Sequence, residues 1–234
     1  MYGRGELRGT ESDKPIAIDK ITKISIEQGA MLNKLMRDHS VERSLEIGLA
    51  YGFSTVWMLD ALCSLKEAEH IAIDPFQKKH WHGIGLAQAA RLEFAGRFEW
   101  LPDYSIHALS DLIRKKQRFD FIYIDGNHRF DDVIVDFYLA DQIMRPGGLI
   151  VLDDMEMNSV RIAANFIINN RAYELVEQSI RNIAVLKKKH DDDRNWKHFV
   201  SFEVHDSSKA SGLQMLKSSL RKAVGRCRRT FRRQ

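Results

Sequence analysis

The 234 residues include 36 basic and 32 acidic side chains, which corresponds to a formal net charge of +4. With 44% hydrophobic and 29% charged residues, the composition is typical of a soluble globular protein and excludes collagen-like, mucin-like and wholly disordered chains. Two cysteines are too few for a disulfide scaffold or a structural zinc cluster, and no apolar run reaches the roughly 18 residues of a membrane span.

Short apolar segments with strand character alternate with segments of helical spacing along most of the chain. Helices are predicted over residues 24–39, 53–65, 84–95, 106–116, 131–144 and 160–169. Strands are predicted over residues 43–48, 69–74, 97–101, 119–125 and 149–152, the last after a turn at 146–148, and then over 173–178, 183–187 and 199–204. This order indicates an α/β fold, with a doubly wound, mostly parallel sheet, helices on both faces and an antiparallel C-terminal edge.

The two ends of the chain differ from this pattern. Residues 1–14 are polar and rich in glycine, so we expect a flexible lead-in there and a single domain over residues 15–206. Residues 207–234 contain nine basic side chains and no acidic one, which leaves the rest of the chain with a net charge of −5. Apolar residues recur at helical spacing in this tail, so it is predicted to be a basic amphipathic helix. Such a helix can lie on an anionic membrane, dock on a partner or extend into solvent.

Ligands of such sheets bind beyond the carboxyl ends of the strands, so the residues there are the candidate site. Gly48 and Gly52 stand between the first main strand and its helix, where glycine permits a tight turn and a close approach of a ligand to free helix amides. The spacing is not that of the dinucleotide fingerprint. The next strand ends in Asp74, whose carboxylate can accept both hydroxyls of a ribose or cap the chain before Pro75. Together the glycines and the acid predict a nucleoside cofactor.

Acidic side chains also stand at the ends of the fourth and fifth predicted strands, over residues 119–125 and 149–152. Asp125 ends one strand, and Asp153 and Asp154 follow the other, so the three carboxylates are expected close together at the carboxyl ends of the strands. Such crowding requires a cation, a shared proton or wide separation. A hard divalent ion such as Mg²⁺ is the simplest answer, and helix capping is the alternative. His128 lies three residues after Asp125; its ordinary pKa of ~6.5 suits a general base, although a surface position in a polar loop is the favoured explanation when this histidine is considered alone.

The run Leu-Glu-Ile-Gly-x-x-x-Gly-x-Ser-Thr from residue 45, followed by Ile-Asp at the end of the next strand, resembles class I S-adenosylmethionine-dependent methyltransferases. The resemblance covers about residues 25–204. It implies a Rossmann-like, seven-stranded sheet and S-adenosylmethionine as the cofactor. The cofactor-binding residues that it implies are Glu46, Gly48, Gly52, Ser54 and Asp74, with Asp103, Tyr104 and Ser105 at the adenine.

Asp-Gly-x-His after the fourth main strand, with Asp-Asp after the fifth, is similar to a branch of metal-dependent O-methyltransferases that includes sugar and macrolide O-methyltransferases. Catechol-type enzymes place a lysine where His128 stands. The resemblance implies that Asp125, Asp153 and Asp154 hold Mg²⁺ and that His128 is the general base. A hydroxyl of a small molecule or sugar would then attack the sulfonium methyl group.

Other functions stay open in the sequence. The missing third glycine argues against a nucleotide-dependent oxidoreductase, and a non-catalytic binding module would not need three acids and a histidine at adjacent strand ends. An RNA methyltransferase is favoured by the basic tail but opposed by the acidic body, so we expect no nucleic acid partner. The opening residues lack the apolar run of a secretory signal, which indicates a cytoplasmic protein. A homo-oligomer and a peripheral membrane contact through the tail are further alternatives.

Overall fold

The structure is a computed structural model that describes most of the chain. The described residues are 5–12, 14–19, 22–92, 94, 96–176, 180 and 182–201. The tail predicted over residues 207–234 therefore lies outside the described residues, as does the end of the strand predicted over 199–204. Among the described helices, none is long and apolar enough to cross a membrane.

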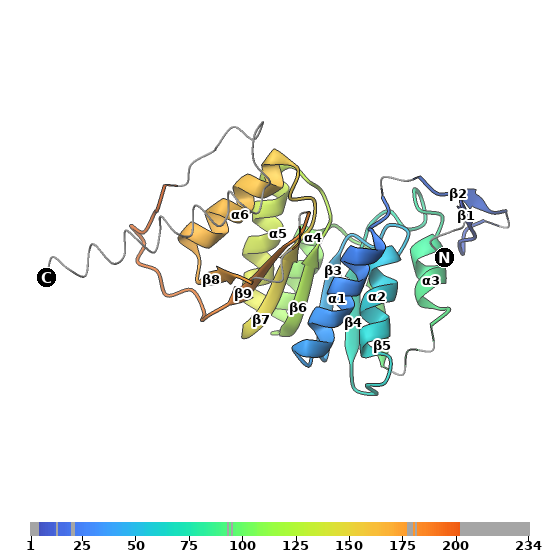
Figure 1. Ribbon diagram of the computed structural model, residues 1–234, viewed down its shortest axis with the longest axis horizontal. Coiled ribbons are helices and arrows are strands. Elements are labelled where there is room, and N and C mark those ends of the chain that lie inside the picture. The colour runs from blue at the N-terminus through green and yellow to red at the C-terminus, as the bar shows by residue number, and fades with distance from the viewer. Residues whose placement is uncertain are drawn as a thin grey trace, which may run out of the picture.

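A seven-stranded sheet forms the centre of the protein (Figure 1), in the order β5-β4-β3-β6-β7-β9-β8. The strands are β3 (Arg43–Ile47), β4 (Glu69–Ile73), β5 (Arg97–Leu101), β6 (Phe119–Ile124), β7 (Met144–Leu152), β8 (Tyr173–Leu175) and β9 (Ala184–Lys188). Strands β3 to β7 pair in parallel, and β9 is antiparallel to both of its neighbours. The strand order reverses between β3 and β6, which is where a ligand site is expected in such sheets. The predicted fold class is confirmed.

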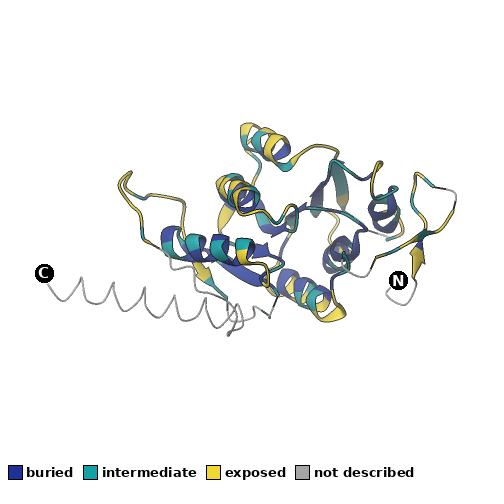
Figure 2. Ribbon diagram, turned by 90° about the horizontal axis from the view of Figure 1, so that it is seen from above, coloured by how far each residue is buried: buried dark blue, intermediate teal, exposed yellow. Residues whose placement is uncertain are grey.

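Among the described residues, six helices cover the two faces of the sheet (Figure 2). They are α1 (Ile26–Asp38), α2 (Phe53–Leu62), α3 (Ile84–Ala89), α4 (Ser105–Arg114), α5 (Phe130–Ile143) and α6 (Asn158–Asn170). The alternation of side chains along β6 explains the two layers: Ile122 and Ile124 pack with α4, α5 and α6, whereas Phe121 and Tyr123 pack with α1 and α2. Both faces of the strand are buried, as its continuous apolar sequence predicts.

The turn predicted at residues 146–148 is instead part of β7, which begins five residues earlier than expected. The strand pairs Met144 with Phe119, loses its register, and resumes with Leu149 opposite Phe121. Proline and glycine are tolerated at such an irregularity, and Gly147 has a φ of +87° there. The prediction of a turn was therefore wrong, and the proline and glycines produce an irregularity within the strand. In addition, α3 ends at Ala89, six residues before the predicted end.

The described part of residues 1–14 is packed on the domain, which differs from the predicted flexible lead-in. Strand β1 (Glu6–Leu7) pairs with β2 (Ile16–Ala17) in an antiparallel hairpin, so a domain boundary at residue 15 would divide it. Leu7 is buried in the same core as Ile84. The backbone N–H of Glu11 donates to the carbonyl of His82, with 3.1 Å between the two atoms. One apolar side chain in a polar segment thus anchors the described part of that segment.

Candidate active site

A cavity of about 1070 Å³ lies at the carboxyl ends of β3, β4, β6 and β7, at the point where the strand order reverses. Loops from distant parts of the sequence meet here. The residues predicted from the sequence that line the cavity are Gly48, Gly52, Ser54, Asp74, Tyr104, Ser105, Asp125, His128, Asp153 and Asp154. Glu46 and Asp103 were predicted as well, but neither lines it. The structure therefore brings most of the predicted site together.

The turn between β3 and α2 alternates between ordinary and left-handed backbone. Gly48, Ala50 and Gly52 have φ values of +96°, +43° and +75°. Ala50 was missed in the sequence because left-handed backbone is uncommon for residues other than glycine. It is held from both sides: its N–H donates to Asp74 Oδ2 at 2.9 Å, and its carbonyl accepts from Gln77 Nε2 at 2.7 Å. The loop after β4 therefore clamps the glycine turn.

Asp74 is buried at the end of β4 and still lines the cavity. Its Oδ2 accepts hydrogen bonds from Ala50 and Gln77, and its Oδ1 accepts one from the backbone N–H of Phe76 at 2.7 Å. Two carboxylate oxygens offer about four acceptor positions, so one on Oδ1 is left for a ligand hydroxyl. Both interpretations of Asp74 therefore fit: it caps the chain around Pro75, and it has room to bind a ribose.

Glu46 lies beneath the turn, fully buried. Its carboxyl accepts hydrogen bonds from Ser54 Oγ and, at 2.5 Å, from Thr55 Oγ1, and His70 Nε2 lies 3.5 Å away. The predicted direct contact of Glu46 with a cofactor is not what this position supports. Instead, Glu46 holds the first turn of α2. No described side chain caps this helix, and the start of a helix favours an anionic group of a ligand.

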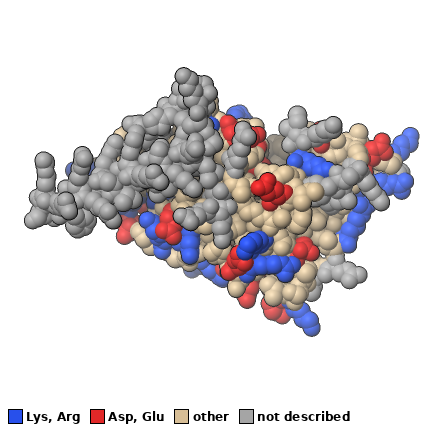
Figure 3. All heavy atoms as spheres, in the orientation of Figure 1, with Lys and Arg blue, Asp and Glu red and all other residues tan. Residues whose placement is uncertain are grey.

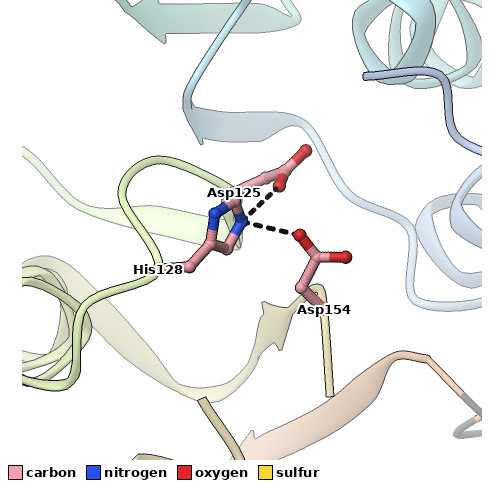
Figure 4. Close-up of side chains that lie close together, drawn as sticks. All are labelled: Asp125, His128 and Asp154. Carbon is pink, nitrogen blue, oxygen red and sulfur yellow. Dashed lines mark hydrogen bonds and ion pairs between the residues drawn. The ribbon is translucent and has the colours of Figure 1, made fainter. Parts of the chain in front are cut away.

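Asp125, His128 and Asp154 form a cluster at the ends of β6 and β7 (Figure 4). The imidazole points between the two carboxylates: His128 Nε2 lies 3.4 Å from Asp125 Oδ1 and 2.8 Å from Asp154 Oδ2. One donor atom from each of the three residues lies within 4.8 Å of the other two. Two carboxylates and one imidazole form a ligand set that divalent cations accept, so the residues present fit a metal ion.

The charges of this cluster depend on each other. Burial raises the pKa of Asp125 to about 8. Hydrogen bonds with Asp125 and Asp154 raise the pKa of His128 to about 10, and the hydrogen bond with His128 lowers the pKa of Asp154. Without a cation, the cluster therefore holds a proton between its acids, which is one of the ways to relieve crowded carboxylates.

Asp153 was predicted to be a metal ligand, but the structure places it outside this cluster. Its Oδ2 accepts a hydrogen bond from the buried hydroxyl of Tyr123, and its Oδ1 accepts from the Asp154 N–H at 2.7 Å and from Gln28 Nε2 at 3.2 Å. Burial raises the pKa of the Tyr123 hydroxyl well above its usual range, which keeps it a donor. Hydrogen-bond donors of the protein thus occupy the Asp153 carboxyl, and it is His128 that lies beside Asp125 and Asp154.

Comparison with known proteins agrees with this geometry. Residues 45–155 match the family model of a methyltransferase domain. The chain is a class I S-adenosylmethionine-dependent methyltransferase. This result decides against the nucleotide-dependent oxidoreductase. Comparison with curated protein sequences gives no match.

Several solved structures share the fold of this methyltransferase. An O-methyltransferase from Bacillus cereus in complex with SAH has 20% sequence identity and a TM-score of 0.62 over 72% of this chain and 84% of that one. The O-methyltransferase TomG from Streptomyces achromogenes, in complex with SAM, has 20% identity and a TM-score of 0.57 over 73% and 83%. The SAH-bound methyltransferase PaMTH1 from Podospora anserina has 16% identity and a TM-score of 0.60 over 72% and 80%.

The three residues predicted to contact the adenine lie in two different environments in the structure of the methyltransferase. Tyr104 and Ser105 line the cavity, and the ring of Tyr104 stands edge-on to that of Phe76 with 5.8 Å between the centroids. Asp103 faces away into solvent, where it accepts a hydrogen bond from the Tyr104 N–H at 2.7 Å and pairs with His107. Two of the three residues predicted from this loop therefore line the cavity, and Asp103 does not.

Replacing Glu46 with glutamine tests whether Glu46 acts through the start of α2. We expect the free energy of unfolding in urea to fall by about 1–3 kcal/mol, because buried hydrogen bonds from Ser54 and Thr55 are weakened. The affinity for S-adenosylhomocysteine, measured by calorimetry, should fall by less than about tenfold, or 1.4 kcal/mol. Ser54→Ala removes one of the same bonds and should act in the same direction. Unchanged stability with a much larger loss of affinity would instead show direct contact.

Proposed function

We propose that this methyltransferase transfers the methyl group of S-adenosylmethionine to a hydroxyl oxygen of a small molecule or sugar, with a divalent cation held by Asp125 and Asp154 and with His128 as the general base. The observation that carries the proposal is that this cluster lines the same cavity as the glycine turn and Asp74. Oxygen as the accepting atom is also supported by the O-methyltransferases from Bacillus cereus and Streptomyces achromogenes, which share the fold.

The surface and the cavity favour a small acceptor. On the face shown in Figure 3, acidic and basic side chains lie interspersed over the described residues. That distribution differs from the stripe of basic side chains that binds a nucleic acid backbone. The cavity volume of about 1070 Å³ is in the range of small-molecule and cofactor sites. Both observations support a small molecule in preference to RNA.

Different residues of the chain have different roles in the proposed reaction. The positive end of the dipole of α2 lies at its start and binds the methionine carboxylate, and Asp74 accepts the ribose hydroxyls. His128 accepts the proton of the acceptor hydroxyl at Nε2. The oxygen then forms its bond to the methyl carbon as the bond from that carbon to sulfur breaks, and S-adenosylhomocysteine leaves. Because the sulfonium methyl is already reactive, the protein mainly positions the two groups and removes the proton.

A divalent cation, when bound, would bring the acceptor hydroxyl to this cluster and lower its pKa. Mg²⁺ prefers oxygen ligands, whereas Mn²⁺ and Zn²⁺ accept imidazole more readily, so all three ions should be compared. The test is methyl transfer to a panel of catechols, sugars and polyketide hydroxyls after treatment with a chelator. We expect transfer to be lost and to return with one of these ions. Transfer that survives complete removal of metal would contradict the proposed metal dependence.

His128→Ala distinguishes a base from a metal ligand, because Nε2 cannot serve as both. If His128 is the base, we expect turnover to fall by about 10²–10⁴-fold, the usual contribution of acid–base catalysis, with nearly unchanged affinity for the cation and for S-adenosylhomocysteine. Calorimetric titration with the metal ion measures the second quantity. A loss of metal affinity as large as that of Asp125→Ala would assign His128 to the ligand set instead, and wild-type turnover would remove it from the mechanism.

A further inference from the structure

One buried acid of the cavity has no part in the mechanism above. Asp136 lies in the second turn of α5, is only 3% exposed and lines the cavity. A carboxyl out of water costs free energy unless hydrogen bonds compensate for it. Such a residue in a binding cavity is therefore a candidate for contact with the ligand.

Asp136 lies between the start of α4 and the loop after β6, which both line the cavity. Its carboxyl lies near the side chain of Ser105, in the first turn of α4. On its other side, a methyl group added to Gly126 would lie 3.6 Å from Asp136 Oδ2, so the loop after β6 passes close by. An acid near the start of α4 is also favoured by the helix dipole, so the experiment below separates a structural role from ligand binding.

The order of the strands sets the direction of the cofactor in the cavity. The methyl group must lie near the cluster that includes Asp154, at the end of β7. Asp74 is at the end of β4, on the opposite side of β3, so the ribose and then the base extend away from β7. At that end, Phe76, Tyr104 and Ile106 line the cavity with aromatic and apolar surface that suits a flat base. Ser105, the neighbour of Asp136, belongs to the same wall.

We propose that Asp136 binds the adenine of the cofactor by accepting a hydrogen bond from its exocyclic amino group. Two observations support it. Asp136 is the buried acid next to Ser105, and Asp103, the acid that the sequence placed at the adenine, points into solvent outside the cavity. The inference rests on the proposed function, which places the methyl group at the cluster, but it can fail while that function holds, because its test measures binding of the adenine and not methyl transfer.

The experiment compares S-adenosylhomocysteine with its analogue in which purine replaces adenine, so that hydrogen replaces the amino group. Binding of both to the full-length wild-type protein is measured by calorimetry. We expect the adenine compound to bind about 10- to 100-fold more tightly, the range for a hydrogen bond to a charged group. In Asp136→Ala the preference should shrink to less than about threefold, because the analogue then loses no partner. Asp103→Ala, a matched change of an acid outside the cavity, should keep the wild-type preference.

Two results would overturn the proposal. One is a wild-type protein that binds both compounds equally well. The other is an Asp136→Ala protein that loses affinity for both compounds by the same factor, because that pattern indicates a structural role at the start of α4. Thermal unfolding of each variant shows whether it is folded. If Asp136→Ala is not, Asp136→Asn keeps the size of the side chain, and its preference for the adenine compound should fall below that of the wild type; an undiminished preference would count against Asp136.

Discussion

Turnover of the Asp154→Asn variant is expected to be at least about 100-fold below that of the wild type, because loss of an outer-shell partner of a metal ligand already lowers affinity or activity by about 10–100-fold. Asp154 Oδ2 lies 2.8 Å from His128 Nε2, and Asp154 is one of the two acids of the cluster. Asparagine is preferred to alanine because Asp154 has a φ of +55°, and asparagine tolerates left-handed backbone. The variant therefore removes the charge with little change in shape.

Affinity for S-adenosylhomocysteine should stay within about threefold of the wild-type value in Asp154→Asn, since Asp74 and the glycine turn are untouched. The matched control is Asp131→Asn, an exposed acid that lines the same cavity at the start of α5. Its turnover should remain close to wild type. Steady-state kinetics at saturating metal ion and calorimetry measure these quantities. Equal turnover of Asp154→Asn and wild type would remove Asp154 from the reaction.

Gly48→Ala is expected to lower both the stability and the cofactor affinity of the protein. A methyl group at residue 48 would overlap the carbonyl oxygen of Asp125, and the φ of +96° disfavours any side chain. Overpacking in a fitted interior costs about 1–3 kcal/mol, and left-handed backbone about 1–2 kcal/mol more. Relief requires a shift of the turn or of the loop that carries Asp125, so we also expect at least a tenfold loss of affinity for S-adenosylhomocysteine, or about 1.4 kcal/mol.

Gly147→Ala separates the two causes of this effect. Gly147 also has positive φ, at +87°, but a methyl group there has nothing within 4 Å. It should lose only the backbone contribution of about 1–2 kcal/mol and keep its cofactor affinity. Unfolding in urea and calorimetry measure both variants. If the two alanine variants lose equal stability and neither loses affinity, the contact between the turn and Asp125 is unimportant.

Much of the fold was predictable because the patterns involved are local. The strands β3, β4, β5 and β6 and the helices between them follow from short apolar runs alternating with helical spacing, and their bounds differ from the prediction by a few residues, except at α3. The early start of β7 and the packing of Leu7 were not predictable from local pattern. Whether a proline–glycine run forms a turn or a bulge within a strand depends on the pairing with β6. Whether a single apolar side chain such as Leu7 is buried depends on the core that it packs against.

The position of the candidate site was predictable for the same reason, since the ends of parallel strands meet at one edge of a sheet. That rule placed Asp74, Asp125, His128 and Asp154 in one cavity. It could not rank Asp153 against Asp154, because successive side chains at a strand end point in opposite directions. The left-handed backbone of Asp154 and the hydroxyl of Tyr123 beside Asp153 decide which carboxyl meets His128.

By itself, the sequence of this protein determined its class of fold, the edge of the sheet that holds the site and the type of cofactor, because these depend on order and spacing along the chain. The tertiary structure decided the direction of each side chain. It directs Glu46 beneath the turn, Asp103 into solvent and Asp136 into the cavity. These outcomes depend on contacts between residues far apart in the sequence, such as Asp136 of α5 with Ser105 of α4, which no local pattern encodes.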